Sequence, residues 1–154
     1  MTLIKSGTYP NENADIGFHE FTYSVYAHSG RWQEAETVQM AYNLNVPLVV
    51  SVQNKKDEKQ KLPVAKIPKS LLSSSRKETF LETIKRSEDG KDWIVRMYEN
   101  CNCHVTASIK TGFPVKKVEE CNLLEKKLRD ISIEKDEFTV SFKPYEIKTF
   151  RFIL

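Results

Sequence analysis

The stretch FTVSFKPYEIKTFRF, residues 138–152, decides the fold class that this sequence predicts. Two segments rich in apolar residues, 138–142 and 145–152, are separated by Lys143 and Pro144, which fall where a connection between strands is needed. The stretch therefore predicts two neighbouring strands. Their expected core residues are Phe138, Val140, Phe142, Ile147 and Phe150.

Five further segments of the same kind precede this stretch at regular spacing. They cover residues 80–84, 93–98, 103–109, 115–121 and 131–133. Asp89-Gly90 lies between the first two, and an Asp-Gly dipeptide is typical of a tight hairpin turn. Seven short strands within about 75 residues predict an all-β fold, namely an antiparallel β-sandwich.

The N-terminal part of the chain predicts one more strand and one helix. In residues 18–27, Phe21, Tyr23 and Val25 recur with the period of two of a half-buried strand. Residues 31–43 contain neither Gly nor Pro and predict the single short α-helix of the fold. The helix face expected to pack on the sheet consists of Trp32, Ala35, Val38 and Tyr42.

The middle of the chain is less regular. Residues 48–52 have the β-branched composition of a buried strand. Residues 53–75 are rich in charge, proline and serine, and predict a long exposed connection with one short strand at 64–67. We expect a single domain over residues 1–154, with this loop-rich segment inside it.

Composition limits the partners that can be expected. The 24 basic and 21 acidic residues give a net charge of +3, and the basic ones are scattered, so we expect no nucleic-acid partner. The longest strongly apolar stretch, 46–52, is far below the roughly 20 residues of a membrane-spanning helix, so we expect no membrane partner. Three cysteines and no recognisable secretory signal predict free thiols and a cytoplasmic location.

Cys101, Cys103 and His104 form the segment that most resembles a metal site. A structural zinc site needs four ligands, and Cys121 could supply the fourth only if the fold brought it near. The interpretation we favour is small thiols in a hairpin turn and its strands, with no metal. Common dinucleotide, phosphate-loop, zinc-protease and serine-hydrolase motifs are missing from the sequence.

The acidic residues of the C-terminal half do not predict a catalytic pair. Retaining glycosidases hold two carboxylates about 5 to 5.5 Å apart. Glu119 and Glu120 are neighbours in an expected strand and must point to opposite faces. Asp89 and Asp92 flank the expected hairpin and are interpreted as turn formers.

Three blocks of sequence go beyond a generic sandwich. They are residues 3–10 with 14–23 (LIKSGTYP and ADIGFHEFTY), residues 41–48 (AYNLNVPL), and residues 113–125 with 143–150 (FPVKKVEECNLLE and KPYEIKTF). In this order they resemble the C-terminal β-domain of bacterial glycoside hydrolase family 38 α-mannosidases. The resemblance covers nearly the whole chain.

The resemblance implies that this chain is part of a larger enzyme. Members of the family are retaining α-mannosidases that remove terminal α-linked mannose. Their catalytic barrel, which carries the aspartate nucleophile and a divalent metal, usually zinc, precedes the β-domains. No catalytic residue and no metal ligand of that barrel has a counterpart here, so this part alone is expected to be inactive and to hold no cofactor.

The resemblance also implies a role beside the catalytic domain, as structural support and as part of the active-site wall. A polar loop ahead of the first expected strand suits contact with sugar hydroxyls. The candidate sugar contacts are Tyr9, Asp15, His19, Glu20 and Tyr23. Expected partners are the catalytic domain and a mannose-containing oligosaccharide, with a homo-oligomer left open. The alternatives are a free-standing carbohydrate-binding module and a protein-interaction module.

Overall fold

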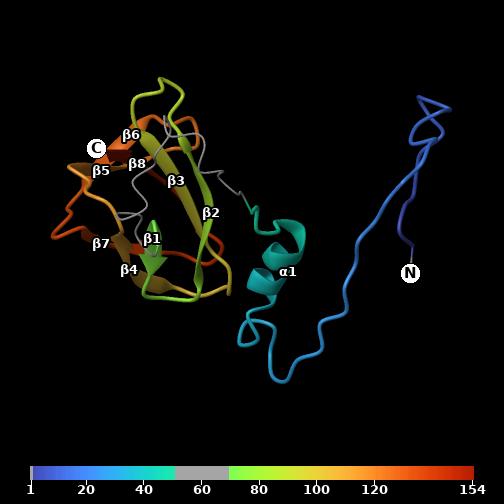
Figure 1. Cartoon of the computed structure of the whole chain (residues 1–154), viewed down its shortest axis with the longest axis horizontal. Coiled ribbons are helices and arrows are strands. Elements are labelled where there is room, and N and C mark those ends of the chain that lie inside the picture. Colours follow the sequence, from blue (N-terminus) through green and yellow to red (C-terminus); the bar gives the residue numbers. More distant parts are fainter. Residues whose placement is uncertain (1, 51–69) are drawn as a thin grey trace, which may run out of the picture.

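A computed structural model describes residues 2–50 and 70–154 of this protein. Residues 70–154 form two antiparallel sheets, which we call the sandwich (Figure 1). One sheet has five strands in the order β2-β3-β8-β5-β6, and the other has three in the order β1-β4-β7. The strands are β1 Leu72–Ser74, β2 Thr79–Arg86, β3 Trp93–Glu99, β4 Val105–Thr111, β5 Lys117–Cys121, β6 Lys127–Ile131, β7 Glu137–Phe142 and β8 Ile147–Ile153.

The core lies between the two sheets and confirms the predicted β-sandwich. β8 is central in its sheet, with β3 on one side and β5 on the other. Phe150 and Phe152 of β8 are fully buried, and Phe138 of β7 meets both rings edge-on at 5.4 and 5.8 Å between ring centroids. Gly90 adopts a φ of +70° in the hairpin between β2 and β3, as the Asp-Gly dipeptide predicts.

Ile147 is the one predicted core residue of the C-terminal stretch that the structure places outside the core. Its side chain is 58% exposed, because alternation along β8 turns Phe150 and Phe152 toward the other sheet and leaves Ile147 on the outer face. β6 covers 127–131 rather than 131–133, and β1 occupies 72–74, where the sequence predicted a connection.

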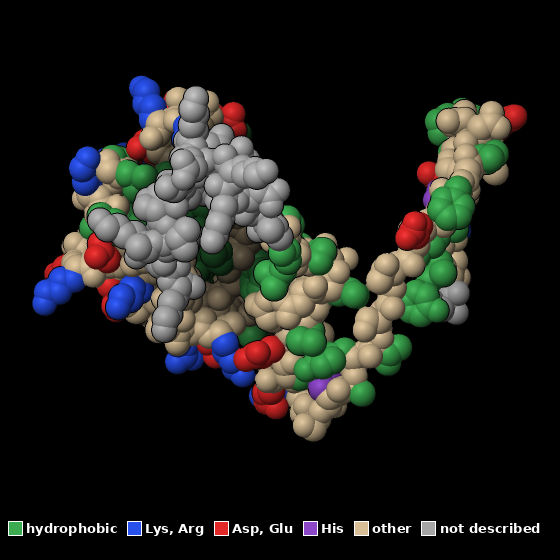
Figure 2. Space-filling model, in the orientation of Figure 1, with side chains coloured by type: hydrophobic (Ala, Val, Ile, Leu, Met, Phe, Trp, Pro, Cys, Tyr) green, Lys and Arg blue, Asp and Glu red, His purple; other side chains and the backbone are tan. Residues whose placement is uncertain are grey.

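The predicted strand at residues 18–27 is not formed. This segment lies within residues 2–30, which extend away from the sandwich and which we call the N-terminal arm (Figures 1 and 2). Phe21, Tyr23 and Val25 are exposed. The prediction was wrong for this structure because a strand requires a neighbouring strand to pair with, and the described part of the chain offers none to the arm.

The helix α1, Thr37–Asn45, confirms the single short helix but starts later than predicted. Residues 32–36 form turns, and Glu36 has a φ of +53°, which interrupts the helical backbone ahead of Thr37. Tyr42 packs on Phe80 of β2 at 4.3 Å between ring centroids, so one predicted face residue does reach the sheet. Trp32 precedes the helix and is exposed, and none of the helical residues is fully buried.

The predicted buried strand at 48–52 is wrong for its described part. Leu48, Val49 and Val50 are almost fully exposed and form no strand. Residues 51–52 and the predicted strand at 64–67 lie outside the described residues.

Candidate functional site

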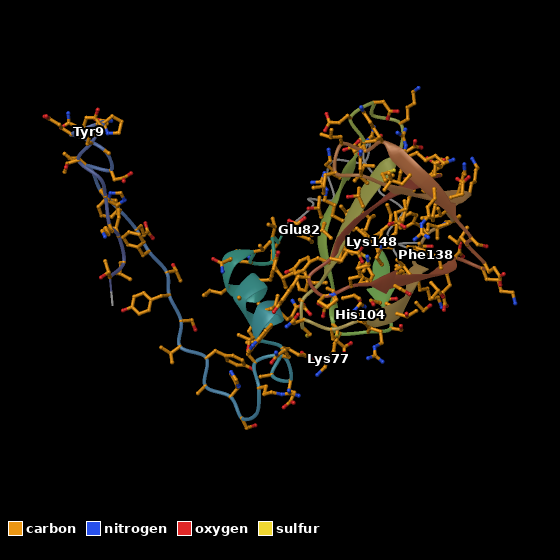
Figure 3. All side chains as sticks on the ribbon, turned by 180° about the vertical axis from the view of Figure 1, so that it is seen from behind. Tyr9, Lys77, Glu82, His104, Phe138 and Lys148 are labelled. Atoms are coloured by element: carbon orange, nitrogen blue, oxygen red, sulfur yellow. The ribbon has the colours of Figure 1, made fainter. Side chains whose placement is uncertain are left out.

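The five predicted sugar contacts all lie on the N-terminal arm. Tyr9 is at its far end, remote from the sandwich, and its ring is 92% exposed (Figure 3). His19 Nε2 lies 2.7 Å from the backbone carbonyl oxygen of Asp15, and the imidazole stacks on Phe21 at 5.9 Å. Glu20 and Tyr23 are exposed. The structure thus brings His19 and Asp15 together, and the described contacts join no others of the five.

These residues could recognise sugar but could not cleave it unaided. Exposed tyrosine rings and carboxylates are suited to packing on a sugar ring and bonding its hydroxyls. None of them lines the three cavities recorded in the described structure, so they do not surround a common cavity there. A second surface would have to complete any binding site.

The last residue of β3, Glu99, carries a buried carboxylate that the sequence did not reveal. Glu99 is fully buried and accepts backbone N–H bonds from Cys101 at 2.6 Å, Asn102 at 3.0 Å and Tyr145 at 2.9 Å. Burial favours the neutral acid, but these backbone bonds outweigh it and hold the pKa of Glu99 below its ordinary value. Glu99 therefore ties the β3–β4 turn to the β7–β8 turn, which is a structural role.

The cysteines of that turn are engaged with neighbouring side chains. The Cys103 thiol donates to Glu99 at 3.3 Å, and burial followed by this bond raises the pKa of Cys103 to about 11. Burial also raises the pKa of Cys101. Both shifts favour the protonated thiol in the described structure. No three His, Cys, Asp or Glu side chains converge as a metal site in residues 2–50 and 70–154.

The two adjacent glutamates of β5 are engaged in ion pairs. As predicted, Glu119 and Glu120 point to opposite faces: Glu119 meets Lys117 at 2.7 Å, and Glu120 meets Lys148 at 2.8 Å. Arg129 also contacts Glu120, at 2.6 Å. Burial favours protonation of Glu120, but Lys148 and Arg129 outweigh burial and lower its pKa. Neither carboxyl is held in the protonated form that a general acid requires.

Asp89 and Asp92 serve the hairpin, as predicted, and in addition both bind Arg151 of β8. Arg151 Nη2 lies 2.6 Å from Asp89 and 2.5 Å from Asp92. Asp89 also accepts bonds from the Ser87 hydroxyl and the Lys91 amide. The pairing of both aspartates with one arginine fastens the hairpin to the central strand and leaves no acid–base pair.

A cleft lies between the helical region and the sandwich. It is lined by Trp32 and Thr37 from the helical region and by Phe80, Leu81, Met97 and Ile109 from the sandwich. Residues of β1 and β2 lie in its lining, and Tyr42 of α1 contacts Phe80 of β2 beside it. Among the described helices, none is long and apolar enough to cross a bilayer.

Comparison with known proteins agrees with the fold. Residues 79–150, which include β2 to β7 and part of β8, match the family model described as the glycosyl hydrolases family 38 C-terminal beta sandwich domain. This confirms the family resemblance drawn from the sequence.

Relatives extend the similarity beyond the sandwich. Alpha-mannosidase G of Dictyostelium discoideum is 33% identical over 99% of this chain, and alpha-mannosidase 2C1 of Mus musculus is 30% identical over 100% of it. Alpha-mannosidase of Saccharomyces cerevisiae is 27% identical over 98%. The chain spans only 14 to 15% of the length of these relatives, which are eukaryotic, so the bacterial origin stays a prediction.

Proposed function

Residues 79–150 belong to the glycosyl hydrolase family 38 C-terminal β-sandwich domains, and from this premise we propose that the chain is the non-catalytic C-terminal part of an α-mannosidase. The observation that carries the proposal is the match along 98 to 100% of this chain to relatives named alpha-mannosidases. The larger enzyme hydrolyses terminal α-linked mannose with retention of configuration, and the reaction takes place in a separate catalytic domain.

The chemistry of the sandwich supports a non-catalytic role. Its buried carboxylates, Glu99 and Glu120, are fully occupied by backbone amides or by cations and are held ionised. Its turn thiols are held protonated. A catalytic domain would supply the nucleophile, the acid and a divalent metal, usually zinc, which polarises the substrate. The sandwich of this chain would provide a rigid surface against which that domain packs.

The N-terminal arm is the part of this chain that we assign to the active-site wall. Tyr9, Asp15, His19, Glu20 and Tyr23 would contact a mannose-containing oligosaccharide once the catalytic domain lies beside them. Their exposure and their mixture of aromatic and polar groups support this assignment. We place the protein in the cytoplasm, which suits three free cysteines.

Activity measurements test the proposal. The isolated chain should not hydrolyse nitrophenyl α-mannoside, with or without added zinc. The same chain joined to the coding sequence that precedes it in its genome should hydrolyse it and release α-mannose first. A mock purification from the same host is the control. Turnover by the isolated chain that survives repurification would contradict the proposal, as would an inactive, folded longer polypeptide.

A free-standing carbohydrate-binding module is the second candidate, and the exposed aromatic rings of the arm favour it. Mannose at millimolar concentration would then shift the amide resonances around Tyr9 in NMR spectra of the isolated chain. Tyr9→Ala should abolish the shifts, while Tyr145→Ala, which removes an exposed ring from the sandwich, should leave them intact. Mannose-induced shifts in the isolated chain would favour this candidate over the wall of a larger site.

A further inference from the structure

The backbone of residues 18–27 is extended and unpaired. Each N–H and C=O of such a segment is free to form a sheet ladder. Among the described residues, side chains of the arm bond to backbone carbonyls nearby in sequence: His19 bonds to Asp15, and the Tyr26 hydroxyl donates to Ala35, just beyond the arm. None of these uses the backbone amides of 18–27.

The side chains of the same segment have the pattern of a strand whose one face is to be buried. Phe21, Tyr23 and Val25 share one side, because successive side chains of an extended backbone alternate. Val25 is 91% exposed, and Phe18, at the start of the segment, is exposed to a similar degree. An apolar row beside an unpaired backbone is the combination that β-strand addition uses, with ladder bonds for affinity and side-chain pockets for specificity.

The sandwich does not receive this strand, although it is close in sequence. The chain returns to the sandwich only after the arm, where Tyr42 of α1 meets Phe80 and Phe80 meets Tyr98 at 5.5 Å. The arm itself points away from the sheets (Figure 1). Its partner must therefore come from outside the described residues.

The relatives indicate where that partner lies. Their similarity covers the arm as well as the sandwich, and roughly six-sevenths of each relative lies outside the matched region. A partner in the same polypeptide is present at an effective concentration in the millimolar range, far above that of a second copy in dilute solution. The rest of the polypeptide is therefore a stronger competitor for the arm than another copy of this chain.

We infer that residues 18–27 add as a β-strand to an open sheet edge in the rest of the larger polypeptide, with Phe21, Tyr23 and Val25 facing its apolar interior. The inference rests on the proposed function. The arm then belongs structurally to the neighbouring domain, and α1 fastens that domain to the sandwich. Single-domain organisation over residues 1–154 would be replaced by two units that meet at α1.

Amide hydrogen exchange tests this inference in the full chain. In the isolated chain at low micromolar concentration, residues 18–27 should exchange at the rate of an unstructured peptide. In the longer polypeptide, exchange of the same residues should slow at least about tenfold, because ladder hydrogen bonds must open first. Equal, fast exchange in both would overturn the inference. Slow exchange in an isolated chain that sediments as a dimer would also overturn it, since a second copy would then be the partner.

Proline variants test the ladder itself. The backbone N–H groups of successive strand residues point to opposite edges of the strand. Thr22→Pro removes an N–H on one edge and Tyr23→Pro removes one on the other, so one of the two variants loses a ladder bond whichever edge is paired. One of them should abolish the slowing in the longer polypeptide, while Thr22→Ala and Tyr23→Phe should preserve it. Slowing that survives both prolines would contradict strand addition. If a proline prevents the longer polypeptide from folding, the test rests on the exchange rates of residues 18–27 in the unsubstituted isolated chain and the unsubstituted longer polypeptide.

The two proposals can fail separately. The same longer polypeptide is assayed on nitrophenyl α-mannoside. Activity with fast exchange at residues 18–27 contradicts strand addition only. Slow exchange without activity supports strand addition and contradicts the proposed function.

Discussion

The sandwich and the N-terminal arm carry similar sequence patterns but have different structures. In β8, Phe150 and Phe152 are fully buried, and the backbone pairs with β3 and β5. In residues 18–27, Phe21, Tyr23 and Val25 repeat the same alternation, yet they are exposed and the backbone is unpaired. The alternation of side chains is therefore not what separates the two regions.

What separates them is the presence of partner strands within the chain. An α-helix satisfies its backbone locally, whereas a strand needs another segment for every ladder bond. β8 has two such segments, because β3 and β5 both pair with it. A period of two thus predicts how side chains would be arranged in a strand, but it does not tell whether this chain supplies the neighbouring strand.

The largest expected effect is a contrast between two deletions. Removing residues 145–154 takes out the central strand, and loss of each buried Phe side chain costs about 3 to 5 kcal/mol, against a total of roughly 5 to 15 kcal/mol for a domain. This variant should be insoluble or unfolded. Removing residues 2–30 should leave the melting temperature of the sandwich unchanged, as followed by circular dichroism. A soluble 145–154 deletion with native melting would break the comparison.

Single substitutions give the next largest contrast. Phe150→Ala should lower the free energy of unfolding of the isolated chain by about 3 to 5 kcal/mol, because Phe150 is fully buried against Phe138. Phe21→Ala, the matched change in the arm, should alter it by less than about 0.5 kcal/mol. Urea denaturation followed by circular dichroism measures both. A loss above about 1 kcal/mol for Phe21→Ala would mean that the arm packs on the sandwich after all.

Prediction from sequence succeeded where the element carries a clear local pattern. The hairpin of β2 and β3 is one case, because Asp89-Gly90 supplies the turn and the two strands that it joins pair with each other. β7 is another, since Phe138, Val140 and Phe142 alternate cleanly and are all buried. In both, the residues that identify the element in the sequence lie within it or beside it.

Prediction from sequence failed for features that depend on contacts with other parts of the chain. β6 is an edge strand of mostly charged residues, and it is held through Lys127 and Arg129, which pair with Glu119 and Glu120 of β5. Such a strand has no apolar alternation to detect. Glu99 could not be identified either, because its amide partner at Tyr145 is 46 residues away. The five sugar-contact residues stay a prediction, since the surface that would complete their site lies outside this chain.

Acid should destabilise the sandwich and hardly affect the arm. Glu99 and Glu120 have pKa values below the ordinary 4.5, so their stabilising contribution is complete above about that pH and is lost as the pH falls through their lowered values. Glu120→Gln should cost about 1 to 3 kcal/mol at neutral pH and should flatten the acid dependence of unfolding. Glu20→Gln in the arm is the control and should change neither. An unaltered acid dependence in Glu120→Gln would contradict the assigned role of this carboxyl.

The smallest effect concerns what the arm does when its partner is missing. The exposed rings of Tyr9 and Phe18 and the side chain of Val25 form apolar surface that water solvates poorly, so isolated chains should associate weakly through their arms. We expect sedimentation velocity to show a concentration-dependent rise in mean mass at about 0.1 mM and above, and a monomer at low micromolar concentration. Phe18→Glu should restore the monomer throughout, because a charge in the contact must be desolvated. Tyr145→Glu, on the sandwich, should not. If association persists in Phe18→Glu and disappears in Tyr145→Glu, the self-associating surface lies on the sandwich and not on the arm, which contradicts this prediction.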